Sequence, residues 1–545
     1  MKFRITIILF LIFQVGKAQY LPVSLHEKDI YAFLDEMANA KLIVVNGAVK
    51  PWSRKTVAKL LLQVEAQKQN LSPRQTKELN WYLREYQNDI SSNTRQKGDI
   101  DLYRPQKNTS FSLHPIGFYY GDSVSQLAVK PVWGINYFFN DNGSIYHRWG
   151  GAEAYGSRGS WGFYASLRDN HESQAISKPV YLTRRTGGNY KALDYSEMLG
   201  GITYQKDWLT IGLVKDFYTV GTNYAGSNII SDRAPSFAHI KLRLTPWDWF
   251  EFNYMHGWLI SNVIDSAHSY ILNDGIRRDV MHKKYIATNM FTFRPWKTLN
   301  LSLGNSVVYS DYQVNPGYLI PFLFYKSVDH SNNSTDGVGK NVGQNSSMFF
   351  DIGYRGIEHV HLYHVQFIDE LKIARWTSQE EHNFYSTKTG VMVSNWPFED
   401  LFFTVEYTKT VPVTYQHDIA TTTYESNGYN FGSYMRDNAD VLFLELRLHP
   451  ARNLNITANY TVERKGPEYG YNRSSPDLTR HPYMEDVKYK RSLLNMGINY
   501  EPTYGLHLFI NATFSNTEGE MANVYVPDFF RGSLFTLSTG FNIGF

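Results

Sequence analysis

Two histidines and two acidic residues have spacings that could support chemistry. His359 and His361 alternate along a predicted strand, so their side chains share one face and could begin a metal site. The nearby sequence supplies no evident third ligand, and we expect a structural pair facing the interior of the fold. Asp369 and Glu370 are adjacent, so on a strand they point to opposite faces and do not form an acid-base pair by spacing alone.

The motifs of common hydrolases are absent from the sequence. Neither a Gly-x-Ser-x-Gly elbow nor a His-Glu-x-x-His zinc motif occurs. We therefore expect a non-catalytic protein that needs no metal or cofactor.

Two groups of loop residues fit the binding of a sugar polymer, which needs aromatic rings for sugar faces and short polar groups for hydroxyls. The first lies in a predicted outer loop at 224–233 and the second in one at 465–489, and a third predicted loop covers 318–345. The candidates are Tyr224, Asn228, Ser231, Asp232, Arg233, Tyr469, Tyr471 and Arg473. Ordinary solvated loops also contain such residues, so this interpretation competes with a purely structural one.

A row of basic residues is a further candidate. His239, Lys241 and Arg243 share one face of a predicted strand and could attract an acidic polymer. Charges on the inner wall of a barrel commonly pair across strands, which is the alternative.

The elements that must position these residues show a period of two from about residue 111 onward. Apolar and polar side chains alternate over 238–244, 442–449, 454–463 and 506–514. Alternation sends one set of side chains to lipid and the other to the lumen of a membrane barrel. A soluble β-sandwich alternates too, so the spacing of turns is needed to separate the two.

Short proline-containing turns recur between the alternating segments. The turns contain Pro246, Pro295, Pro397, Pro450 and Pro502. Successive prolines are about fifty residues apart, except that one interval is twice as long. That longer interval contains a predicted turn without proline near 354–356. Each unit reads as strand, long loop, strand, short turn, which is typical of outer-membrane barrels. Counting back from the C-terminus predicts eighteen antiparallel strands over 127–545, with 111–120 left over.

The N-terminus predicts export. Basic residues precede an apolar run of about eleven residues, shorter than the ~20 of a membrane helix, and cleavage is expected between Ala18 and Gln19. Without the signal the chain has 51 basic and 51 acidic residues, a balance that disfavours nucleic acid as a partner. The chain has no cysteine and is 16% aromatic, as expected for a barrel with aromatic girdles.

Residues 19–90 have helical periodicity instead. Ser24 to Glu27 forms a predicted capping box, Ser53 a predicted cap of a second helix, and Ser72-Pro73 the start of a third. We expect a periplasmic helical bundle, followed at 91–126 by a linker or plug-like connection.

The C-terminus carries apolar residues on one face of a last strand, including Phe541 and Phe545. Such an aromatic C-terminal strand predicts recognition by the barrel assembly machinery and residence in outer-membrane lipid.

With barrel and helices in place, the chain resembles the Wzi-type capsule assembly family of outer-membrane barrels. The stretches that carry the resemblance are 49–54, 221–235 and 362–370. Asn228 and Val220 depart from the Leu and Trp commoner in the family. The resemblance implies a lectin-like, eighteen-stranded barrel that binds capsular or extracellular polysaccharide at the surface of a Gram-negative cell.

Three hypotheses follow. The leading one is a non-catalytic polysaccharide-binding protein of the outer membrane. The others are a porin-like transport channel, suggested by the strand number, and an outer-membrane hydrolase with Ser and His on the barrel wall.

Overall fold

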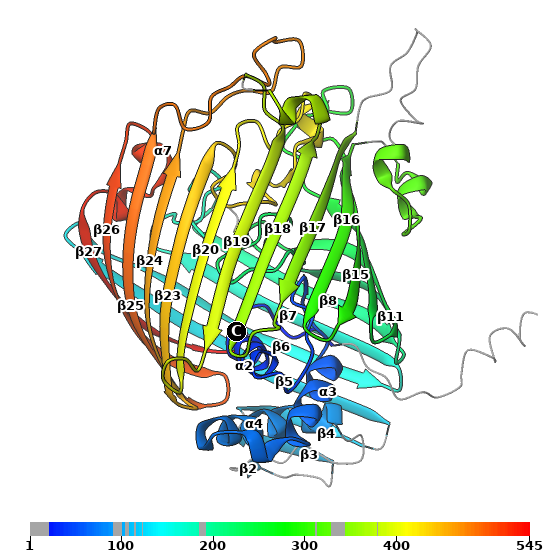
Figure 1. Cartoon of the computed structure of the whole chain (residues 1–545), viewed down its shortest axis with the longest axis vertical. Helices are drawn as coiled ribbons and strands as arrows, with labels where there is room; N and C mark the ends of the chain where they lie inside the picture. The colour runs from blue at the N-terminus through cyan, green and yellow to red at the C-terminus, as the bar shows by residue number, and fades with distance from the viewer. Residues whose placement is uncertain are drawn as a thin grey trace, which may run out of the picture.

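A closed antiparallel barrel of eighteen strands dominates the computed structural model (Figure 1). Each wall strand pairs with the next, and the last strand returns to pair with the first through Phe541 and Ile135. The wall strands are β5 (Ser125–Asn140), β6 (Gly143–Arg158), β7 (Trp161–Glu172), β8 (Asp194–Gln205), β9 (Leu209–Asp216), β11 (Phe237–Trp247), β12 (Phe250–Leu259), β15 (Lys284–Trp296), β16 (Leu299–Tyr309), β17 (Asn345–Tyr354), β18 (Val360–Glu370), β19 (Phe384–Ser394), β20 (Leu401–Thr410), β23 (Ala439–Ala451), β24 (Leu454–Lys465), β25 (Tyr489–Thr503), β26 (Leu506–Glu518) and β27 (Leu534–Ile543).

The structure describes residues 21–90, 101–103, 108–113, 116–122, 124–184, 192–310, 313–328, 344–378 and 380–544. The predicted signal peptide, its cleavage point at Ala18 and Gln19, and the terminal Phe545 lie outside these residues. Among the described residues, no helix is both long and apolar enough to cross a membrane.

Alternating side chains explain the two faces of the wall. On β23 and β25, the outward residues Leu446, Leu448, Met496 and Ile498 are between 39 and 47% exposed in the isolated chain, as expected of a surface covered by lipid. The side chains between them point into the lumen.

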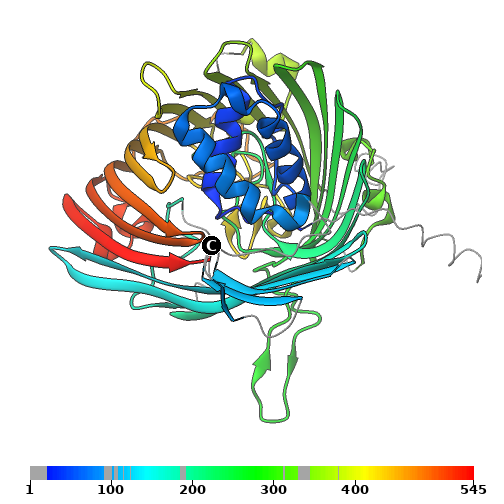
Figure 2. The ribbon, with the colours of Figure 1, turned by 90° about the horizontal axis from the view of Figure 1, so that it is seen from below.

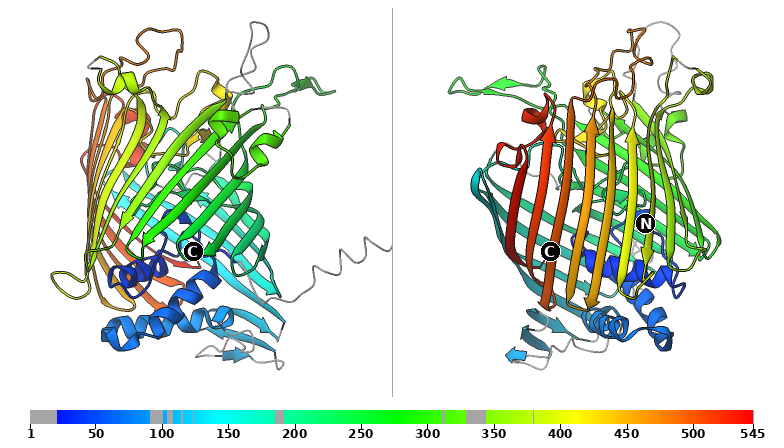
Figure 3. Two further views of the ribbon diagram at one scale, coloured as in Figure 1. Left: turned by 45° about the vertical axis from the view of Figure 1, so that its right-hand side comes forward. Right: turned by 60° about the vertical axis from the view of Figure 1, so that its left-hand side comes forward.

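Short turns join the strands at one end of the barrel and mostly long loops join them at the other (Figure 3). Four of the predicted prolines lie at β-bulges, where the register shifts between residue pairs such as Leu244 and Trp247 or Tyr500 and Thr503. Proline suits a bulge because it has no amide hydrogen to give to the ladder. The expected turn without proline follows Tyr354, at the end of β17.

The described residues 109–113 and 116–121 do not form a plug. β3 (Thr109–Leu113) and β4 (Ile116–Gly121) form a hairpin, and β4 pairs with the first part of β5, below the stretch that pairs with β27. β2 (Asp101–Tyr103) adds to β3. The leftover segment therefore extends the sheet beyond the closed wall, and the expectation of a plug-like connection is wrong for it.

Among the described residues, four α-helices precede the barrel and cover its short-turn end (Figure 2). Their bounds are α2 (Lys28–Asn39), α3 (Arg54–Glu65), α4 (Pro73–Glu85) and α5 (Gln87–Ile90), with the 3-10 turn η1 (Lys68–Asn70) before α4. Ser53 caps α3, as predicted, by accepting from the amide of Thr56. Helix α4 starts where predicted, and there Ser72 and Gln75 form a capping box. The capping box predicted at Ser24 is wrong, since α2 begins four residues later at Lys28 and Ser24 accepts from the amide of His26.

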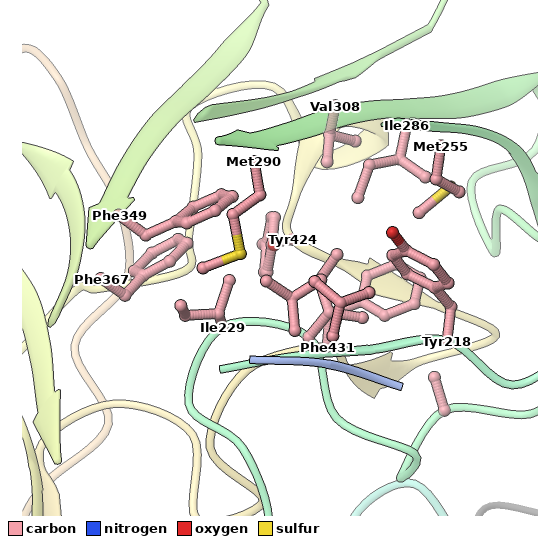
Figure 4. Close-up of a cluster of buried hydrophobic side chains, with 14 of the residues drawn as sticks. Tyr218, Ile229, Met255, Ile286, Met290, Val308, Phe349, Phe367, Tyr424 and Phe431 are labelled. Carbon is pink, nitrogen blue, oxygen red and sulfur yellow. The ribbon is translucent and has the colours of Figure 1, made fainter. Parts of the chain in front are cut away.

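The interior of the barrel holds a packed core. Buried side chains from β1 (Val49–Lys50), from the 217–236 segment and from the 411–438 segment pack against the inner wall (Figure 4). We call these three segments the lumen plug. Its residues include Tyr218, Ile229, Tyr424 and Phe431, which contact wall residues such as Met255. The plug also contains β10 (Thr219–Val220), η4 (Ala420–Thr422), β21 (Glu425–Ser426) and β22 (Tyr429–Asn430).

Candidate functional site

The 217–236 part of the lumen plug is held by a buried carboxylate of the wall. Glu406 on β20 accepts the backbone amides of Tyr224 and Ala225 at 2.7 and 2.8 Å and the hydroxyl of Tyr363 at 2.5 Å. Lys388 on β19 donates to the same carboxylate at 3.2 Å, and both side chains are almost fully buried. The side chain of Glu406 therefore satisfies several donors that would otherwise be buried without partners.

A second wall carboxylate repeats the arrangement. Asp351 on β17 accepts the amide of Thr222 at 2.5 Å and its hydroxyl at 3.1 Å. Gly221 next to it adopts φ of 101°, a conformation that favours glycine. The segment also pairs with the N-terminal chain, since Val220 faces Val49 in a short antiparallel ladder. These contacts fold the segment into the barrel.

The first group of predicted binding residues belongs to this plug. Tyr224 is half-buried and bonds to His361 at 2.9 Å, while Asn228 is fully buried and donates to the carbonyl of Ser386 at 3.1 Å. Ser231 is buried and donates to the carbonyl of Phe431 at 2.9 Å. The expectation of an exposed outer loop at 224–233 is therefore wrong.

The two charged members of that group are also enclosed. Arg233 is buried and donates to the backbone carbonyls of Thr183 at 2.7 Å and Pro179 at 3.2 Å. Asp232 is partly buried within the same segment. These side chains stabilise the plug, and the structure does not present them to a polymer at the loop end.

The predicted basic row lines the inner wall, where each member has close neighbours. His239 is fully buried with Nδ1 3.0 Å from the carbonyl of Phe237, and Lys241 is buried beside it. Arg243 pairs with Glu251 of the next strand at 3.0 Å. The Arg243 contact is the cross-strand pairing that was the alternative to a polymer-binding role.

His359 and His361 do not form the expected pair. His359 lies in the turn before β18 with φ of 68°, whereas His361 lies within β18 and contacts Tyr224. Asp369 and Glu370 have different partners, as their adjacency predicts. Asp369 accepts the amide of Tyr415, and Glu370 pairs with Arg375 at 3.1 Å.

The second group of predicted residues lies where expected, in the long loop between β24 and β25. The ring of Tyr469 stacks on that of His481 with centroids 4.1 Å apart and an angle of 8°. Tyr471 lies 5.9 Å from the ring of His417, which belongs to the neighbouring long loop. We call Tyr469, Tyr471, His417 and His481 the rim cluster. Gln416 joins the two loops, donating to the carbonyl of Tyr469 at 2.9 Å and accepting from the amide of Tyr471 at 3.1 Å.

The side chains of the rim cluster are neutral near pH 7, and the positively charged Arg473 lies beside them. Burial raises the pKa of Tyr471 to about 12, so its hydroxyl stays protonated. Burial also lowers the pKa of both histidines, and Arg473 adds to the lowering at His417. Arg473 itself is exposed. The arrangement combines half-exposed ring faces, neutral hydrogen-bonding groups and a solvated positive charge.

Sequence reasoning missed His417 and Gln416, although both are needed to fix the cluster. They lie more than fifty residues from Tyr469 and Tyr471 in the chain, and no local motif marks them. Two further contributors, Phe384 and Leu478, are buried below the rings.

The third predicted loop, 318–345, is only partly described. Its described beginning, with η2 (Pro316–Leu319), lies outside the barrel against the outer face of β12, β15 and β16 (Figure 1). This part does not join the other long loops at the end of the barrel, so the prediction of an outer loop is wrong for it.

The remaining outer loops contain short elements of their own. They are β13 (Tyr270–Ile271), β14 (Arg277–Arg278), η3 (Ile373–Trp376), α7 (Ala522–Tyr525) and η5 (Asp528–Phe530). The hairpin of β13 and β14 projects sideways past the wall (Figures 2 and 3).

Buried ion pairs fasten the helices to the short-turn end of the barrel. Arg74 of α4 bonds to Glu36 of α2, to Glu78 at 2.7 Å and to Asp400 of the β19–β20 turn at 2.5 Å. Arg355 of the β17–β18 turn pairs with Asp35 at 2.5 Å. Further round the wall, β5 and α4 are joined by an ion pair of 2.8 Å. Several points of attachment therefore hold the helices in one position.

A cavity of 360 Å³ remains between the helices and the wall near the β27–β5 seam. Trp149, Glu153, Glu501 and Tyr504 are among its lining residues. Within the described part of the chain, no three His, Asp or Glu side chains are grouped so that they could hold a metal ion.

No protein-family model matches the chain, and no curated protein matches it in sequence. Among solved structures it is similar to Wzi of Escherichia coli, described as an outer-membrane protein involved in group 1 capsule assembly and a carbohydrate-binding β-barrel. The TM-score is 0.58 at 12% identity, and the match covers 97% of this chain and 100% of Wzi.

Two further solved structures, one of them the outer-membrane protein OprD, have lower TM-scores. OprD of Pseudomonas aeruginosa has a TM-score of 0.40 at 11% identity, covering 77% of this chain and 92% of its own. OccAB2 of Acinetobacter baumannii has a TM-score of 0.42 at 9% identity, covering 76% and 97%. At these identities the likeness concerns the fold. The predicted eighteen-stranded antiparallel barrel with N-terminal helices, and its resemblance to Wzi in fold, are confirmed.

Proposed function

We propose that this protein binds capsular or extracellular polysaccharide at the cell surface and holds it there without catalysis. The observation that carries the proposal is the rim cluster, an aromatic platform at the long-loop end of a barrel whose interior is packed. A filled lumen favours a role at the loop end over passage through the wall.

The chemistry of the rim cluster suits a sugar polymer. Tyr469 and His481 form a double layer of rings on which the apolar face of a pyranose could stack. Protonated Tyr471 and neutral His417 can exchange hydrogen bonds with hydroxyl groups, and Arg473 would favour an acidic sugar. Binding on rigidly held loops costs little ordering entropy.

The likeness to Wzi supports the ligand class, because Wzi is described as carbohydrate-binding. At 12% identity it does not identify the sugar, which must follow from the residues of this chain.

The same proposal includes an orientation. We place the short-turn end and the helices in the periplasm and the long loops outside the cell, in keeping with outer-membrane barrels generally. The β27 strand containing Phe541 would be read by the barrel assembly machinery, and the outward apolar band would be covered by outer-membrane lipid.

The proposal is tested by retention of purified polysaccharide on the detergent-solubilised protein. A Tyr469→Ala/Tyr471→Ala variant should lose most of the retention, since each truncation removes about 1 kcal/mol or more of contact. Tyr270→Ala is the matched control, because Tyr270 is 56% exposed on a hairpin away from the rim cluster. Equal retention by both variants would refute the site.

The alternatives have separate readouts. Release of glycan or lipid fragments by the wild-type protein would indicate a hydrolase, and steady high conductance in a planar bilayer would indicate a channel.

A further inference from the structure

A segment between β16 and β17 lies against the membrane-facing side of the wall. We call residues 313–328 the wall flap; the views from the side and from below both place it outside the barrel (Figures 1 and 2). Lumen-facing Met255 and Ile286 contact the plug, so Tyr254 and Tyr285, their neighbours in sequence, point to the outer face. Both tyrosines are only 5% exposed, because the flap covers them.

Aromatic contacts seal the interface between flap and wall. Phe322 of the flap stacks on Phe252 of β12 with centroids 4.5 Å apart and an angle of 27°. Tyr318 of the flap is fully buried with its ring 4.7 Å from that of Tyr309 on β16. The flap is therefore packed on the wall as a folded element.

Two asparagines on the outer face fasten the flap through its backbone. Asn289 of β15 donates to the carbonyls of Pro321 and Leu323 at 2.8 and 2.9 Å. Asn305 of β16, directly opposite in the ladder, accepts the amide of Tyr325 at 2.9 Å and donates to Asn289 at 2.7 Å. Irregular backbone is tolerated at membrane depth only where protein satisfies its polar groups, and this pair does so.

The flap reaches a level between the two ends of the wall. Phe252 lies seven residues from Leu259, the loop-side end of β12, which is roughly 20 Å of strand. Trp258 is exposed near that end, and Trp247 and Trp249 stack at 5.3 Å near the short-turn end. Aromatic residues mark the two membrane interfaces of a barrel, so the contact at Phe252 falls within the hydrocarbon band.

The outward side of the flap is apolar. Leu319, Ile320, Phe322 and Phe324 are 43, 49, 55 and 44% exposed. Among its sixteen residues Lys326 is the one charged side chain. Leu303, on the outer face of β16, is 55% exposed and continues the same apolar surface below the flap.

We propose that the wall flap is embedded in the hydrocarbon layer of the membrane and that its partner is the acyl chains of the lipid. The flap thus folds back over the polar side chains of Asn289 and Asn305 on the outer face of the wall. It covers them in place of lipid and exposes its own apolar side chains to the membrane. This inference rests on the wall and the flap alone and does not depend on polysaccharide binding.

Spin-label accessibility tests the proposal on the full chain, which contains no cysteine and so can be labelled at one chosen site. Ile320→Cys reports on the flap, Leu303→Cys on the lipid-facing wall, and Ile373→Cys on an outer loop where the side chain is 79% exposed. Each labelled protein is reconstituted into phosphatidylcholine vesicles, and collision with oxygen is compared with collision with a nickel chelate.

The expected ratio of oxygen to nickel accessibility at Ile320 matches that at Leu303 and exceeds that at Ile373 about tenfold, because nickel chelate is excluded from hydrocarbon. A ratio at Ile320 equal to that at Ile373 would place the flap in water and overturn the proposal. Low accessibility to both reagents would show a protein partner and overturn it too. Phe324→Cys repeats the test if Ile320→Cys does not fold.

The role of Asn289 in holding the flap on the wall is tested in the labelled Ile320→Cys protein. Asn289→Ala should raise the mobility of the label and its contact with nickel, because two backbone carbonyls lose their donor. Asn495→Ala is the matched control, since Asn495 accepts from Thr513 elsewhere on the wall at 2.8 Å. Identical spectra for the two variants would contradict the role given to Asn289.

Discussion

Replacement of Glu406 by glutamine should open the barrel. Glu406 accepts two backbone amides of the lumen plug, a tyrosine hydroxyl and the ammonium of Lys388. Glutamine keeps the size of the side chain, but its amide nitrogen cannot accept a hydrogen bond. At least one donor therefore loses its partner, and Lys388 is left as a buried cation without its counter-ion.

The magnitude follows from those contacts. An unsatisfied buried donor costs about 1–3 kcal/mol, and breaking a buried ion pair costs about 3–5 kcal/mol. Part of that cost is recovered when the 217–236 segment leaves the wall and water enters. If about 4 kcal/mol favours release, the ratio of released to docked segment rises by close to three orders of magnitude.

Conductance in a planar bilayer measures this ratio. The wild-type protein should conduct little, while Glu406→Gln should show frequent openings. Glu445→Gln is the control, because Glu445 lies on the neighbouring strand β23 and makes none of these plug contacts. The reasoning would be refuted by a wild-type protein that conducts like an open eighteen-stranded pore, or by two variants that both behave like wild type.

Three further predictions concern the helices and the barrel seam. Arg74→Met removes a buried cation that contacts two helices and a turn of the barrel, so it should weaken the docking of the helices by about 3–5 kcal/mol. Hydrogen exchange should become faster in residues 28–90. The heat-modifiable migration of the barrel in detergent gels should not change. Gly540→Ala places a methyl group 1.9 Å from a backbone oxygen of β5 and should lower the unfolding temperature, whereas Gly470→Ala, with nothing within 4 Å, should not. Burial lowers the pKa of His26 from 6.5 to about 3, so its contribution to stability is complete above pH 6.5 and is lost as the pH falls toward 3. Proteolysis of 21–27 should therefore accelerate between pH 7 and pH 4 more in the wild type than in His26→Phe.

The strands of the wall were predictable because each depends on residues that are close together in the sequence. Alternation and prolines near turns fix strands and short turns within a few residues, and they gave the first wall strand near Leu127 where the structure begins it at Ser125. The cap at Ser53 and the start of α4 after Ser72 were predictable for the same reason.

The direction in which a loop folds was not predictable from local pattern. The 217–236 segment enters the lumen because Glu406 and Asp351, far away in the chain, accept its amides. Polar residues such as Asn228 and Ser231 therefore look like surface residues in the sequence although they are buried. The wall flap did leave a signal, since a stretch of sixteen residues with one charge is unusual within a solvated loop.

The rim cluster was half predictable. Tyr469, Tyr471 and Arg473 stand out as aromatic and basic residues in a long loop, whereas His417 joins them only because the neighbouring loop packs alongside. His359 was misplaced because a turn with positive φ interrupts the expected strand before His361.

Polymer distribution in living cells tests the proposed function most directly. In a strain that lacks this protein, cell-attached and released polysaccharide are measured separately, with complementation by the wild type or by Tyr469→Ala/Tyr471→Ala. We predict that attached polymer falls, released polymer rises and the total stays constant, with rescue by the wild type and not by the double variant. An unchanged attached fraction in the deletion strain, or full rescue by the double variant, would contradict the account.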